Sequence, residues 1–102
     1  MSGQTAWDAN KRLVGGTDLR AQARQALLNL RNVVEASGGT LEDVVSVRIY
    51  VVAYEAHKAE AVGAAFREFF SGDASPAATW VGVAALADPG FLIEIEAIAV
   101  ID

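Results

Sequence analysis

The sequence predicts a single α+β domain, spanning residues 1–102, in which two helices cover one face of a β-sheet. Two stretches with apolar residues at helical spacing alternate with three stretches that have the β-branched, alternating character of strands. Of the 102 residues, 53% are hydrophobic and 21% are charged, which is typical of one compact globular domain. Two helices can cover only one side of the sheet, so we expect another chain to cover the other side.

The first helix is predicted between Thr17 and the pair Gly38-Gly39. Thr17 is the expected N-cap, Asp18 falls in the first turn, and the two glycines end the helix. The apolar residues between these ends share one stripe at helical spacing: Leu19, Ala23, Ala26, Leu27, Leu30, Val33 and Val34.

A strand and a second helix are predicted next. The stretch VVSVRIYVV at residues 44–52 is rich in β-branched residues. Alternation puts its odd-numbered residues on an apolar face and its even-numbered residues, which include Arg48 and Tyr50, on a mixed face. The second helix lies within residues 54–73 and ends at Ser71-Gly72. Its buried stripe is formed by Ala59, Val62, Ala65, Phe66, Phe69 and Phe70.

The last part of the chain is predicted to be a β-hairpin. Its strands run from about residue 79 to 86 and from about residue 91 to 101, and Pro89 and Gly90 between them suit a turn. In the second strand, Glu94 and Glu96 share the face that points away from the apolar residues 93 and 95. We expect that face to be apolar enough to need an oligomer, because it also carries Val44, Tyr50, Val52, Trp80, Leu86, Leu92, Ile98 and Val100.

Composition and charge argue against several classes of protein. Without cysteine the chain has no disulfide, no thiolate nucleophile and no cysteine-based metal site. The net charge is −5 and the eight Lys and Arg residues are scattered, so we expect no nucleic acid partner. The start MSGQTAWDANKRLVGG lacks signal-peptide features and no apolar run is long enough for a membrane span, so we expect a cytoplasmic protein with no membrane partner. With no phosphate loop, HExxH motif or metal-ligand cluster, no cofactor and no metal are expected.

Short motifs follow one another along the chain in an order that resembles one protein family. They are SGQ, QARQALLNL, VVEASGG, LEDVV, FREFF, SPAATWVGVAAL and IEIEAIAV. Together they resemble the Rid family, also called YjgF or L-PSP endoribonuclease-like. The resemblance implies a chorismate-mutase-like α+β fold, a mixed sheet with two helices on one face, and a homotrimer with pockets between subunits. Relatives carry a first strand and most of a second before SGQ, so the chain looks N-terminally short.

The functions known in the family are also expectations here. The best-known members hydrolyse enamines and imines released by pyridoxal-phosphate enzymes, and others have been called ribonucleases or translation inhibitors. Glu94 matches the family's water-orienting glutamate and is the candidate catalytic residue. The arginine that binds the substrate carboxylate falls on Ala78, which cannot make that bidentate contact. Trp80 stands where members of the family often have a cysteine. Gly63 stands where an asparagine is common early in the second helix.

The ligand-binding residues that the resemblance implies are therefore Ser2, Gly3, Gly63, Ala78, Thr79, Trp80 and Glu94. Two functions follow from this set. One is a non-catalytic homotrimer that binds a small metabolite between subunits, because loss of the carboxylate clamp argues against the standard imine deaminase activity. The other is an enamine or imine hydrolase with an altered substrate, in which Glu94 positions water and Trp80 holds an apolar or aromatic ligand.

Structural roles for the same residues also remain open. Glu94 and Glu96 can be solvated or paired with Arg48, and Trp80 can be packing at an interface. Arg48 is also the first candidate to replace the missing clamp if imine turnover occurs. An endoribonuclease is less supported, because the only histidine, His57, is expected at the surface of a helix start and no second histidine or basic cleft accompanies it.

Overall fold

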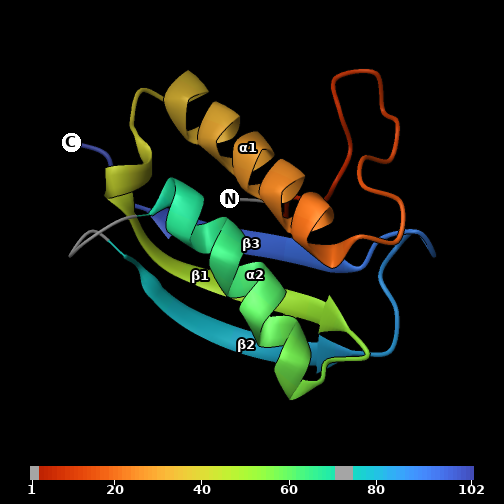
Figure 1. Ribbon diagram of the computed structural model, residues 1–102. Coiled ribbons are helices and arrows are strands. Elements are labelled where there is room, and N and C mark those ends of the chain that lie inside the picture. The colour runs from red at the N-terminus through yellow and green to blue at the C-terminus, as the bar shows by residue number, and fades with distance from the viewer. Residues whose placement is uncertain (1–2, 71–74) are drawn as a thin grey trace.

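The computed structural model describes residues 3–70 and 75–102, which form a mixed three-stranded sheet with two helices on one face (Figure 1). In chain order the elements are α1 (Leu19–Ala36), the 3-10 turn η1 (Leu41–Asp43), β1 (Val44–Val52), α2 (Ala56–Phe69), β2 (Ala77–Val83) and β3 (Ile93–Ala99). This is the predicted α+β layering. Within the described residues, neither helix covers the opposite side of the sheet, which we call the outer face.

The strand order is β2-β1-β3, so β1 is central and the predicted hairpin between the last two strands is wrong. β2 runs parallel to β1 after the α2 crossover, and β3 runs antiparallel to β1 on its other side. The predicted turn exists, since the backbone N–H of Gly90 donates to Asp88 Oδ1 at 2.8 Å. However, β2 ends at Val83 and β3 begins at Ile93, so the connection is too long for a tight hairpin and carries the chain to the other side of β1.

α1 is capped by Asp18 rather than by the predicted Thr17. Asp18 Oδ1 accepts a hydrogen bond from the backbone N–H of the third helical residue at 3.2 Å, which satisfies one of the free donors of the first turn. At the other end Gly38 has a φ of +94°, in the left-handed region that favours glycine. The backbone N–H of Gly39 then donates to Val34 O at 3.0 Å. The predicted end of the helix at the glycine pair is confirmed.

β1 departs from strict alternation at its start. The register between β1 and β3 shifts between Val44 and Ser46, which marks a β-bulge. As a result Val44 is 3% exposed and Val45 is 49% exposed, the reverse of the faces that alternation predicts. From Val47 onward every second residue is buried under the helices, as predicted.

The core lies between the two helices and the sheet. Its largest fully buried apolar residues come from all four neighbouring elements: Leu27, Leu30, Val34, Val47, Ile49, Val51, Val62, Ile93 and Ile95. Burial of one such side chain contributes about 1.5–3 kcal/mol of stability. This layer therefore fixes the position of α2 relative to β1, on which the candidate site depends.

Gln22 of α1 is the buried polar residue of the described core, with 0% exposure. Its Nε2 donates to the carbonyl oxygens of Gly16 at 2.6 Å and Gly90 at 2.8 Å. Its Oε1 accepts a hydrogen bond from the backbone N–H of Leu92 at 2.8 Å. The amide thus ties the start of α1 to the loop that leads into β3, and both of its donors are used.

Residues before α1 add to the sheet at one point. Gln4 pairs antiparallel with Ile95, with its N–H donating to Ile95 O at 2.7 Å and its carbonyl accepting from Ile95 N at 2.9 Å. This pairing lies on the side of β3 away from β1. It brings Gly3 beside Glu94.

Candidate functional site

The outer face carries two glutamates of β3 in different environments. Glu96 is opposite Arg48 of β1, and Glu94 is opposite Tyr50. The Tyr50 hydroxyl donates to Glu96 Oε1 at 2.5 Å. This hydrogen bond favours the protonated phenol and raises the pKa of Tyr50 above its ordinary value of 10.0, while nearby Arg48 partly opposes it. Glu96 is therefore engaged within the chain.

Glu94 lies directly against the backbone of Gly3. A Cβ atom at residue 3 would lie 2.6 Å from both Cδ and Oε2 of Glu94, so a side chain at this position would displace the carboxylate from where it lies. Glu94 is half-buried, and within the described part of the chain no hydrogen bond or ion pair engages its carboxylate. Ser2, the other residue expected here, lies outside the described residues. Glu94 and Gly3 thus form one corner with a carboxylate that is available to a ligand or a water molecule.

A second set of expected site residues lies on the helix side of β2. A hollow of about 210 Å³ opens there between α2 and the edge of the sheet, and we call it the β2-edge hollow. Ala78 and Trp80 of β2 border it, and Gly63 and Arg67 of α2 line its other side. Trp80 is 38% exposed.

Trp80 does not share a face with Glu94, which corrects the prediction. Trp80 is opposite the buried Ile49, whereas Glu94 is opposite Tyr50 on the outer face. The sequence AATWVGV has no alternation of polar and apolar residues, so it does not specify which side of β2 is buried. The expected site residues therefore separate: Gly3, Thr79 and Glu94 lie on or beside the outer face, and Gly63, Ala78 and Trp80 lie on the helix side.

Arg67 is the charged residue of the β2-edge hollow that sequence reasoning missed. Arg48, the expected replacement for the clamp arginine, lies on the outer face with Tyr50 and Glu96 and does not line this hollow. The available signal was spacing, because Arg67 follows Gly63 by one helical turn and must lie on the same side of α2.

The family model described as Endoribonuclease L-PSP matches residues 1–101 of the chain. The chain belongs to this family. Solved structures agree with the assignment, and one of them is a protein of unknown function of the Rid family, YyfB from Yersinia pestis. It is 46% identical, with a TM-score of 0.93, and the match covers 99% of this chain and 76% of that one.

Two further structures place this Rid-family chain in the same group. A putative endoribonuclease from Thermotoga maritima is 36% identical with a TM-score of 0.87, and the match covers 100% of this chain and 77% of that one. RidA from the Antarctic bacterium Psychrobacter is 33% identical with a TM-score of 0.87, and the match covers 99% and 78%. The expected family and the chorismate-mutase-like α+β fold are confirmed.

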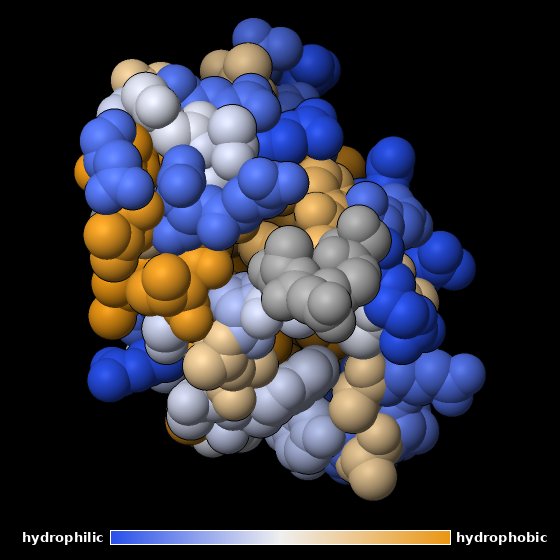
Figure 2. Space-filling view, turned by 90° about the vertical axis from the view of Figure 1, so that its left-hand side faces the viewer, coloured by the Kyte–Doolittle hydropathy of each residue, from blue (hydrophilic) through white to orange (hydrophobic). Residues whose placement is uncertain are grey.

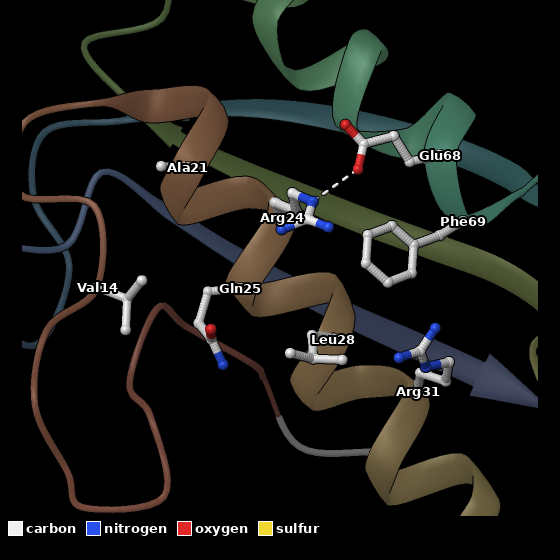
Figure 3. Close-up of a pocket in the computed structure, with 8 residues that line it drawn as sticks. All are labelled: Val14, Ala21, Arg24, Gln25, Leu28, Arg31, Glu68 and Phe69. Atoms are coloured by element: carbon white, nitrogen blue, oxygen red, sulfur yellow. Dashed lines mark hydrogen bonds and ion pairs between the residues drawn. The ribbon is translucent and has the colours of Figure 1, made fainter.

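A groove between α1 and α2 on the outside of this Rid-family domain is internally paired (Figure 3). Glu68 of α2 accepts hydrogen bonds from Arg24 at 2.7 Å and from Arg20 at 3.1 Å, and these contacts lower the pKa of Glu68. The guanidinium of Arg31 lies 5.4 Å from the ring of Phe69. These contacts link the two helices, so we assign the groove a structural role.

The described residues contain neither a cluster of metal ligands nor a membrane-spanning helix. No group of three or more His, Cys, Asp and Glu side chains within residues 3–70 and 75–102 is placed to hold a metal ion. His57 is exposed at the start of α2, where its Nδ1 lies 3.2 Å from Glu55 Oε2. Neither of the described helices is long and apolar enough to cross a membrane.

Proposed function

We propose that this Rid-family protein is a homotrimer whose intersubunit pockets bind a small metabolite. The observation that carries the proposal is the separation of the expected site residues onto opposite sides of one sheet. Glu94 and Gly3 lie on the outer face and at the edge of β3, whereas Ala78 and Trp80 lie on the helix side of β2. One chain cannot bring these groups together across its own central strand. A neighbouring chain that packs against the outer face can do so.

The apolar character of the outer face supports the same proposal. Ile98 is 60% exposed, Val100 is 61% exposed and Val45 is 49% exposed, and strand pairing gathers all three at one end of the sheet. Figure 2 shows hydrophobic surface concentrated along one side of the end of the molecule that carries the C-terminus. Such a surface is expected to be covered in solution.

Residue 78 supports binding rather than the standard chemistry of the family. Alanine there provides no cation for a substrate carboxylate. We expect the purified protein not to accelerate ammonia release from 2-iminopropanoate or 2-iminobutanoate above the uncatalysed rate. Clear turnover in a coupled ammonia assay would favour the second candidate function, an imine or enamine hydrolase with an altered substrate. The observation that favours this alternative is the retained Glu94 carboxylate against Gly3.

The assembly is tested by light scattering after size exclusion at micromolar concentration. We expect a mass three times the chain mass of 10.7 kDa. Ile98→Asp should lower this mass, because it places a charge at the proposed interface. Val33→Asp is the matched control, since Val33 is 36% exposed on α1 in the helix layer and should leave the trimer intact. A stable wild-type monomer would overturn the proposal.

A further inference from the structure

The β2-edge hollow contains a cation that the expected family pattern does not assign. Arg67 follows Gly63 by one helical turn, and a Cβ atom on Gly63 would lie 3.4 Å from Arg67 Nη1. The guanidinium therefore lies beside the space that residue 63 leaves open by having no side chain. Ala78, across the hollow, also leaves space because its side chain is a single methyl group.

No described carboxylate balances the charge of Arg67 within the hollow. Among the described residues, carboxylates pair with Arg12, Arg20 and Arg24, but no ion pair engages Arg67. No acidic side chain of the described chain lines the hollow. A guanidinium beside apolar surface and without a carboxylate favours the binding of an anion.

Apart from Ser75, the other described side chains that line the hollow are apolar or aromatic. Ile49 of β1, Phe66 of α2 and Phe70, the C-cap residue of α2, contribute apolar surface, and Trp80 lies at the rim. The Trp80 ring is 5.9 Å from the ring of Tyr54 at an angle of 58°. One cation beside such surface fits a ligand with one negative charge and a bulky apolar body. A polyanion needs several cations, and the described lining of this hollow provides one.

We propose that Arg67 binds the carboxylate of the ligand, and that the ligand is a monocarboxylate with an aromatic or other bulky apolar group. This inference rests on the proposed intersubunit pocket. It moves the anion-binding arginine from β2, where the family pattern places it at residue 78, to α2. The apolar group of the ligand then packs against Trp80, and the small residues Gly63 and Ala78 leave room for it.

The test compares a charged probe with a neutral probe of the same shape. Binding of 3-phenylpropanoate and of 3-phenylpropanamide to the wild-type protein is measured by calorimetry and by quenching of tryptophan fluorescence. We expect the carboxylate to bind about tenfold more tightly than the amide, because a charge-assisted contact at a partly exposed site contributes on this order. Arg67→Gln should remove this preference, and Arg67→Lys should retain part of it.

Controls separate a binding role from a structural one. Arg31→Gln makes the same change of charge next to an aromatic ring of the other groove and should keep the tenfold preference. Arg67 also lies in the last turn of α2, where a cation stabilises the helix end. A role limited to the helix would lower the unfolding temperature of Arg67→Gln and leave the preference between the probes unchanged.

The outcomes distinguish this inference from the proposed function. If Arg67→Gln remains a trimer and keeps the preference for the carboxylate, Arg67 is not the anion-binding residue, although the pocket stands. If the wild-type trimer binds both probes equally, or binds neither, the ligand class is wrong. If the wild-type protein is monomeric, the proposed intersubunit pocket itself fails.

Discussion

Replacement of Gln22 by leucine tests the link between α1 and the loop before β3. Gln22→Leu keeps a similar volume but removes two donors and one acceptor, which leaves the carbonyl oxygens of Gly16 and Gly90 and the N–H of Leu92 without their partner. An unsatisfied buried polar group costs about 1–3 kcal/mol. Gly16 is exposed, so water can replace the lost partner of its carbonyl. The carbonyl of Gly90 and the N–H of Leu92 are left unsatisfied. Gly90 and Leu92 are half-buried, so each should cost about 1–2 kcal/mol, and we expect a total loss of about 2–4 kcal/mol, a large part of the stability of a domain of this size.

The measurement is thermal and urea unfolding at one protein concentration, so that any assembly affects all variants equally. A loss of this size lowers the midpoint by roughly 10–20 °C for a chain of this length. Gln25→Leu is the matched control, because the Gln25 Nε2 donates to Asn29 on the same helix at 2.9 Å in a half-buried position. That variant should stay within about 0.5 kcal/mol of the wild type.

Gln22→Glu adds a second, pH-dependent readout. One oxygen of the introduced carboxylate can still accept a hydrogen bond from the N–H of Leu92. Its other oxygen faces the carbonyl oxygens of Gly16 and Gly90 and has no proton to donate to them. Burial and these carbonyls should raise the pKa of the introduced acid in the folded state, so the variant should regain stability relative to wild type as the pH falls. Gln22→Leu should show no such recovery. If Gln22→Leu is as stable as the control, the amide network is not the stabilising link that its geometry indicates.

Three further predictions concern the two faces of the sheet. Glu94→Gln should leave the oligomeric mass unchanged and weaken the binding of 3-phenylpropanamide, the probe whose N–H groups can donate to this carboxylate. If Glu94→Gln leaves binding unchanged and Glu96→Gln abolishes it, the site has been placed on the wrong glutamate. Glu96→Gln should lower the pKa of Tyr50 toward 10.0 in a spectroscopic titration. In the wild type, the hydrogen bond between Tyr50 and Glu96 stabilises the fold below pH 10, and this stabilisation is lost as the pH rises through the raised pKa of Tyr50. Gly63→Ala should increase stability by about 0.5–1 kcal/mol in urea unfolding, because alanine favours the helix and its Cβ meets only the flexible end of Arg67; destabilisation would mean that the space beside residue 63 is not open.

Periodicity predicted the elements of the fold but not the neighbours of each strand. The stripes of α1 and α2 and the buried face of β3 follow from spacing, because each is amphipathic. β2 has no such contrast, so its face was assigned wrongly, and with it the position of Trp80. Strand order depends on the α2 crossover and on where β3 can pair, which a local pattern does not contain.

The site was predicted in part for a related reason. The family motifs identified Glu94 and Gly3 as site residues, and the structure places these two residues in contact. Arg67 lies within the FREFF motif, but the resemblance assigns it no role, and its position in the hollow follows from the helical turn that separates it from Gly63. The bulge that exposes Val45 is equally invisible in a run of valines, since one extra residue changes the faces without changing the composition.

The central position of β1 has a consequence for synthesis of the chain. Both strands that pair with β1 follow it in the sequence, so this strand emerges from the ribosome with two unpaired edges. Its nine residues, VVSVRIYVV, contain one charge, Arg48, and are otherwise of the kind that aggregates when exposed. At ordinary rates of translation the last residue of β3 follows the end of β1 by roughly 2–10 seconds. During that interval the nascent chain depends on α1, which is already synthesised, or on a chaperone to cover the strand.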